Sequence, residues 1–102
     1  MDRVEDAFEA YRNASAREVN GSRALVEAGS YALTLQRSPL AQGFLEKAVE
    51  RTPGSAVAQA RYADALLARG EKDKAKQHYQ LALRAQGQID RVDIQRRIDA
   101  LK

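Results

Sequence analysis

A pattern of small and large residues that returns every 34 positions constrains this chain more than any other feature. In each copy a small residue is followed four positions later by a large one, and three positions after that by a second small one. The copies are Ala7, Tyr11 and Ala14; Ala41, Leu45 and Ala48; and Ala75, Tyr79 and Ala82. On an α-helix this spacing forms one stripe, where small residues let two helices approach and a large residue fills the remaining space. The pattern therefore predicts a chain of repeated helix pairs.

Residues that interrupt helices divide the chain into segments of similar length. These interruptions are Asn20-Gly21, Pro39, Pro53-Gly54, Gly70 and Gly87. Between them we expect helices at 3–18, 22–35, 38–51, 55–69, 72–85 and 89–101. Long unbranched side chains and alanine dominate these segments, and strand-forming residues are sparse, so the sequence predicts an all-α fold.

Several residues predict where these helices begin and end. Ser38, followed by Pro39, is expected to cap the third helix, and Ser22 and Ser55 are expected to cap the second and fourth. Gly70 suits the left-handed residue that ends the fourth helix.

Composition excludes several classes of function. The chain has 102 residues, enough for one domain. It contains no cysteine and one histidine, which excludes disulfides, cysteine nucleophiles, zinc fingers and iron–sulfur clusters. No apolar run reaches the length of about 20 residues that spans a bilayer, so we expect no membrane-spanning segment. We expect no cofactor and no metal, and the compartment stays open between cytoplasm and periplasm.

The charge is uneven along the chain. The net charge is +3, and residues 69–102 hold nine of the basic and five of the acidic residues. Lys72, Lys74 and Lys76 alternate with other residues, among them the acidic Asp73, and lack the interleaved aromatic residues that stack on nucleic-acid bases. A solvated helix face explains this stretch better than nucleic-acid binding does.

In its repeated small and large residues, the sequence resembles the tetratricopeptide repeat (TPR) family. Its pattern of small and large positions is met in residues 22–55 by Gly29, Ala41, Leu45, Ala48 and Pro53. In residues 56–89 the matching positions are Ala63, Ala75, Tyr79 and Ala82, although Gly87 stands where the family usually has proline.

The same resemblance implies incomplete units at both ends. Residues 1–21 match only the second helix of a repeat, and residues 90–102 depart from the pattern. The last helix carries the apolar residues Ile89, Val92, Ile94, Ile98 and Leu101, as a capping helix would. The expected architecture is an α-solenoid of antiparallel helix pairs, with about two and a half TPR units and a C-terminal capping helix.

The resemblance implies a non-catalytic module that binds a protein or peptide. In this family the first helix of each repeat lines a concave face. The positions that usually contact a partner are Arg23, Val26, Ser30, Leu33 and Thr34 in one repeat, and Val57, Ala60, Asp64, Leu67 and Ala68 in the next. We expect apolar anchors to supply affinity, and Arg23 and Asp64 to supply orientation. Val26 and Ala60 stand where some members carry a clamp lysine, so a C-terminal carboxylate is not the expected ligand.

Other interpretations of these residues stay open. The groove residues Val26, Leu33, Val57 and Leu67 could serve packing alone. The chain could also be an accessory or regulatory segment of a larger enzyme or of a secretion or envelope assembly protein. His78 is interpreted as a surface residue on the convex side, because no Ser or Cys nucleophile is placed to use it.

Phe8 stands at a position where the two complete repeats carry Gln42 and Lys76. Two outcomes are open for this residue. Either the face bearing Val4, Phe8 and Tyr11 lacks cover and forms a weak homodimer through the N-terminal helix, or Phe8 folds onto the helix at 22–35 and is buried.

Overall fold

The computed structural model describes residues 3–18 and 20–101, and within them the chain forms six helices and no strand. The helices are α1 (Arg3–Arg17), α2 (Arg23–Thr34), α3 (Ser38–Arg51), α4 (Ala56–Ala68), α5 (Lys72–Arg84) and α6 (Arg91–Ala100). They begin and end close to the predicted limits, and the all-α expectation is confirmed.

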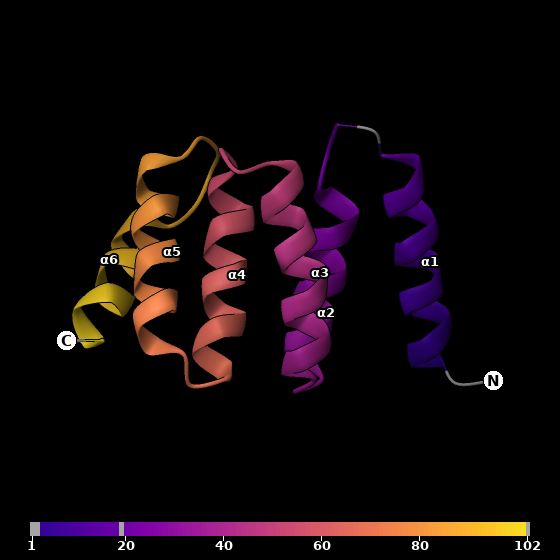
Figure 1. The fold of residues 1–102 in the computed structure, drawn as a ribbon, viewed down its shortest axis with the longest axis horizontal. Coiled ribbons are helices and arrows are strands. Elements are labelled where there is room, and N and C mark those ends of the chain that lie inside the picture. The colour runs from indigo at the N-terminus through magenta and orange to yellow at the C-terminus, as the bar shows by residue number, and fades with distance from the viewer. Residues whose placement is uncertain (1–2, 19, 102) are drawn as a thin grey trace.

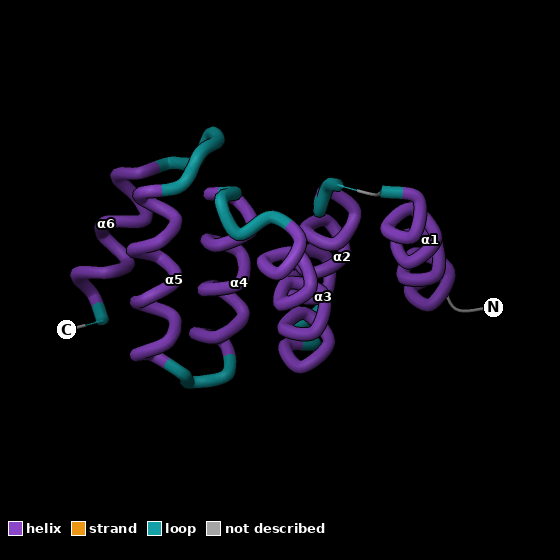
Figure 2. The backbone as a smooth tube through the Cα atoms, turned by 45° about the horizontal axis from the view of Figure 1, so that its top comes forward, coloured by secondary structure: helices purple, strands orange, loops and turns teal. Residues whose placement is uncertain are grey.

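The helices stand side by side in an elongated array measuring 43 × 27 × 19 Å (Figure 1). Each helix packs against the next one along the chain, and α2 also packs against α4. In the view of Figure 1, α2 lies behind α3 and α6 lies behind α5. Figure 2 shows that from α2 to α6 short loops join successive helices at alternate ends. The pairs α2–α3 and α4–α5 fall within residues 22–55 and 56–89, and α6 follows them.

The repeated stripe forms the contact inside each pair. Ala41, Leu45 and Ala48 are fully buried beneath α2, and so are Ala75, Tyr79 and Ala82 beneath α4. A Cβ atom added to Gly29 would lie 2.3 Å from Cγ of Leu45, which explains why glycine occupies this position.

In α1 the same stripe is covered only in part. Ala7 and Tyr11 are half-buried and Ala14 is exposed. The buried residues of α1 are Phe8 and Ser15, which lie on a neighbouring stripe. No first helix covers the face of α1 that bears Ala7 and Ala14 within the part of the chain that the structure describes.

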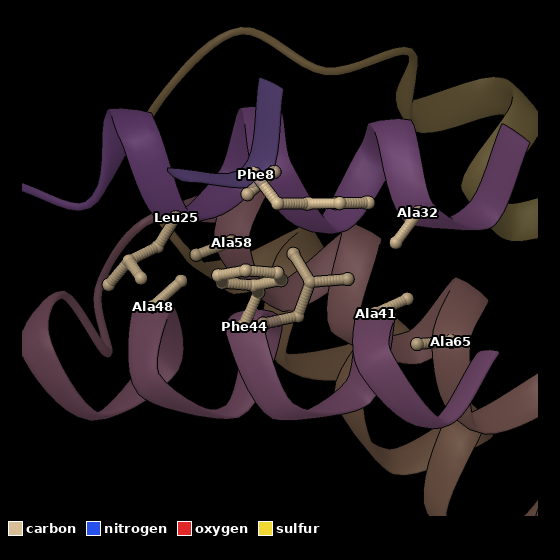
Figure 3. Close-up of a cluster of buried hydrophobic side chains, with 10 residues drawn as sticks. Phe8, Leu25, Ala32, Ala41, Phe44, Ala48, Ala58 and Ala65 are labelled. Carbon is tan, nitrogen blue, oxygen red and sulfur yellow. The ribbon is translucent and has the colours of Figure 1, made fainter. Parts of the chain in front are cut away.

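Phe8 is fully buried, so the second of the two outcomes is the correct one. Its ring packs against Tyr31 of α2, with 5.4 Å between ring centroids, and stacks on Phe44 of α3, with 5.7 Å between centroids. Figure 3 shows Phe8 and Phe44 in this buried cluster. The Phe8 side chain is enclosed by α2 and α3, so it offers no exposed contact for a homodimer, and a homodimer through the rest of the N-terminal helix stays a prediction.

Helix ends follow the expected chemistry in part. Ser55 caps α4, since its Oγ accepts a hydrogen bond from the amide of Ala58. The predicted cap at Ser38 is wrong, because Arg37 is the N-cap residue of α3. Ser22 holds the N-cap position of α2, yet its hydroxyl bonds to Oγ1 of Thr52 at 2.6 Å.

Glu18 supplies the cap that Ser22 does not. Its carboxylate accepts hydrogen bonds from the backbone amides of Arg23, at 3.3 Å, and Ala24, at 2.7 Å. A carboxylate at a helix N-terminus both satisfies unpaired amides and interacts favourably with the helix dipole.

The C-terminal helix packs mainly through two residues. Ile94 and Ile98 are buried against the cluster around Tyr79, and Ile89 and Leu101 are partly buried there. Val92 is 65% exposed, so its expected place in the apolar face is wrong. It lies just past the Asp90 cap, in the first turn of α6.

Candidate partner-binding groove

The structure places all ten predicted groove residues on two adjacent helices. Five lie on α2 and five on α4, and these two helices pack against each other directly. The 34-residue period brings equivalent positions of both repeats to one face, which is how a solenoid builds an extended binding surface.

The clearest cavity on this face lies at the N-terminal ends of α2 and α4. It has a volume of about 430 Å³ and is lined by Ser22, Arg23, Val26, Glu27, Ser55 and Val57. Arg23, Val26 and Val57 were predicted to be groove residues. The other three were not predicted from the sequence. Ser22 and Ser55 stand at the starts of α2 and α4, and Glu27 lies one turn beyond Arg23, so their positions in the sequence could have indicated that they line the groove.

Arg23 remains available to a ligand. Its side chain is 86% exposed, and its only ion pair among the described residues joins Nε to Oε1 of Glu27 at 3.1 Å, one turn along the same helix. An exposed pair of this kind contributes little free energy, so a ligand carboxylate could replace Glu27 at small cost.

The remaining groove residues divide by exposure. Thr34 and Ala68 are exposed, whereas Ser30, Leu33 and Leu67 are half-buried. Leu33 packs against the core around Leu45, and Leu67 packs against the core around Tyr79. Val26 also packs against the core around Leu45, whereas Val57 is half-buried without belonging to either core cluster, so part of its side chain is free to contact a ligand.

Two predicted groove residues are not accessible. Ala60, on α4, is fully buried and presents no surface to a ligand. The side chain of Asp64 is only 15% exposed, and both of its carboxylate oxygens already have partners. The expectation that Asp64 orients a ligand is therefore not supported by its surroundings.

Asp64 instead joins three helices. Its carboxylate accepts hydrogen bonds from Tyr79 on α5, from Arg61 on α4, and from Arg97 on α6 at 2.6 Å. Burial and the hydrogen bond to Asp64 raise the pKa of the Tyr79 hydroxyl to about 12. Arg97 also pairs with Asp93 at 2.9 Å. This network holds α6 against α4 and satisfies the charges at that end of the face.

His78 does not point outward as predicted. Its ring lies between α4 and α5, where it meets the edge of Tyr62 with 4.7 Å between centroids. Its Nδ1 lies 2.7 Å from Oε1 of Gln59, and the amide nitrogen of Gln59 donates to the carbonyl of Pro53. The Gln59 side chain therefore forms a polar bridge between the loop at Pro53 and His78 on α5.

Across residues 3–18 and 20–101, no group of three or more His, Cys, Asp or Glu side chains is arranged to hold a metal ion. No helix in the same residues is both long and apolar enough to cross a membrane.

Comparison with known proteins agrees with this geometry. A family model described as tetratricopeptide repeat matches residues 25–97, which span α2 to α5 and most of α6. The chain belongs to the tetratricopeptide repeat family, whose repeats generally mediate protein–protein interactions. A search of curated proteins finds no match to the chain.

Proposed function

We propose that this protein is a non-catalytic module that binds a protein or peptide in the groove between α2 and α4. The single observation that carries the proposal is the pocket formed by Arg23, Val26 and Val57, where a charged and exposed side chain borders two apolar ones. Such an arrangement suits an extended or helical segment, with one apolar side chain in the pocket and an acidic group beside Arg23.

The groove available to the partner is shorter than the ten residues suggested. Ala60 is covered and Asp64 is held by Tyr79, Arg61 and Arg97. We therefore centre the site on Arg23, Val26 and Val57, and place Thr34 and Ala68, which are exposed, at its far end.

The test uses two matched valine substitutions. Val57→Asp places a charge in the groove, and Val92→Asp places the same charge on the exposed start of α6. Partners captured by the wild-type chain should be lost with Val57→Asp and kept with Val92→Asp, while both variants retain the helical circular dichroism spectrum. Equal capture by the two variants would exclude this groove as the binding site.

A second candidate function is that of an accessory or regulatory segment within a larger assembly. The uncovered face of α1 favours it, because the equivalent residues of α3 and α5 are fully buried by a first helix. Hydrogen exchange tests this candidate. The amides of α1 should exchange faster than those of α3 in the isolated chain and become protected only when the larger partner is present.

A further inference from the structure

A second groove lies between α1 and α3, the two helices drawn in front of and beside α2 in Figure 1. It consists of two adjoining pockets of about 230 and 280 Å³, which share Arg12, Phe44 and Lys47. The rest of its lining is formed by Pro39, Leu40, Gly43, Ser15, Ala16, Leu25 and Arg51. From Pro39 to Arg51 the groove follows α3 for roughly 18 Å, at about 1.5 Å per residue.

The floor of this α1–α3 groove is apolar. Phe44 is 8% exposed and is stacked on Phe8, and Leu25 of α2 belongs to the same buried cluster (Figure 3). Gly43 leaves additional room, since a Cβ atom added there would have no neighbour within 4 Å. An apolar side chain of a partner could occupy this space and contact the rim of the Phe44 ring.

The walls of the groove carry three cations and no acid. Arg12, Lys47 and Arg51 are exposed, and none of them forms an ion pair with any residue that the structure describes. The guanidinium of Arg12 lies 5.6 Å from the centre of the Phe44 ring. Arg51 donates through Nη1 to the carbonyl and the hydroxyl of Ser15, which fixes its position without neutralising its charge.

This charge is not a property of the repeat itself. The residues 34 positions after Arg12, Lys47 and Arg51 are Glu46, Leu81 and Ala85, which include one acid and no base. The concentration of positive charge over an apolar floor is thus particular to the α1–α3 groove.

We propose that the α1–α3 groove binds an acidic peptide segment that carries an aromatic or branched aliphatic side chain. The apolar side chain would lie beside Gly43 against Phe44, and carboxylates on either side would pair with Arg12, Lys47 and Arg51. Charge complementarity identifies the partner, because uncompensated cations raise the local concentration of acidic ligands and speed their association. This site is on a different face from the groove between α2 and α4 and does not depend on it.

The test uses the whole chain and a designed peptide. The probe is a short peptide in which aspartate and glutamate flank phenylalanine and leucine, and the control peptide has each carboxylate replaced by its amide. In nuclear magnetic resonance titrations the acidic peptide should shift the amide signals of residues 12–16 and 39–51 and leave those of 57–68 in place. The amide control should bind more weakly, and added salt should weaken the binding of the acidic peptide.

Matched variants separate the charge from the fold. Lys47→Glu should lower the affinity for the acidic peptide by about tenfold. Arg96→Glu makes an equal change of charge on the exposed side of α6 and should alter this affinity by less than about twofold. Gly43→Leu should fill the groove and abolish binding while the chain remains helical, because the new side chain projects into open space.

Several results would overturn the proposal. These are a dissociation constant weaker than about 1 mM for the acidic peptide, shifts confined to α2 and α4, or equal effects of Lys47→Glu and Arg96→Glu. A single-stranded DNA oligonucleotide that displaces the peptide and binds more tightly, with the same dependence on Lys47, would also overturn it and assign the groove to nucleic acid.

Discussion

His78 is held in one tautomer by the residues around it. The carbonyl of Pro53 can only accept a hydrogen bond, so the amide nitrogen of Gln59 must face it and the amide oxygen must face His78. Nδ1 of His78 therefore carries a proton. Burial disfavours adding a second proton to the ring, and it lowers the pKa of His78 below its ordinary value.

This lowered pKa predicts a dependence of stability on pH. Between the folded pKa and the unfolded value of about 6.5, the unfolded chain binds more protons at His78 than the native chain does. The free energy of unfolding should therefore fall as the pH drops below about 6.5, and level off for this residue once the pH is below its folded pKa.

Urea denaturation of the wild type and of His78→Gln, from about pH 7.5 to about pH 5.5, measures this effect. In the variant, the free energy of unfolding should no longer change with pH near neutrality, where carboxylates do not titrate. The same pH dependence in both proteins would contradict the lowered pKa.

Phe8 is predicted to stabilise the monomer. Phe8→Ala should lower the free energy of unfolding by about 3–5 kcal/mol, the usual cost of removing a buried phenylalanine ring. Val92→Ala, at an exposed position, should change it by less than about 0.5 kcal/mol. Loss of self-association in Phe8→Ala without loss of stability would instead mean that the ring lies in an interface between two chains.

At the residue scale, the sequence predicted burial better than it predicted partners. Gly29 and the alanines of the two complete repeats were identified because their spacing marks close helix contacts. The role of Asp64 could not be predicted, since it depends on Tyr79 and on Arg97, which lies 33 residues further along the chain. The environment of His78 was missed for the same reason, as Gln59 and Tyr62 belong to another helix.

At the element scale, the loop that follows α2 and the loop that follows α4 have the same turn geometry, although their residues differ. Gly70 has a φ of 79° after α4, and Gln36, which is 34 positions earlier, has a φ of 59° after α2. In both loops the next amide bonds back to the helix, from Glu71 to Leu66 and from Arg37 to Ala32, each at 2.9 Å. The geometry of the turn is a property of the repeat, and a glutamine adopts it at some cost in free energy.

Two glycines on adjacent elements make a matched pair of predictions about packing. Gly29→Ala should destabilise the protein by about 1–3 kcal/mol, because the new Cβ atom would overlap Leu45 where α2 crosses α3. Gly43→Ala should stabilise it by about 0.5–1 kcal/mol, because alanine favours the helix and meets no neighbour.

Thermal unfolding of both variants beside the wild type checks this pair. Shifts of the melting temperature in the same direction would show that α2 and α3 are not packed in this register.

At the scale of the whole molecule, the 34-residue period predicted the stacking of the helix pairs and the face that they share. It did not predict how much of that face stays open. Asp64, one turn before the exposed Ala68, is held by Arg61 and Arg97, and Arg97 comes from α6. Likewise, the α1–α3 groove depends on α1, which lies before the residues that match the family.

Site-specific photo-cross-linking tests most directly whether a protein partner lies in the groove between α2 and α4, with p-benzoylphenylalanine in place of Glu27 in one protein and of Arg96 in another. Both side chains are exposed, but only Glu27 lines the groove, and its replacement leaves Arg23, Val26 and Val57 unchanged. We predict that the partner captured by the wild type becomes cross-linked at position 27 and not at position 96. Efficient cross-linking at 96 with none at 27 would contradict this.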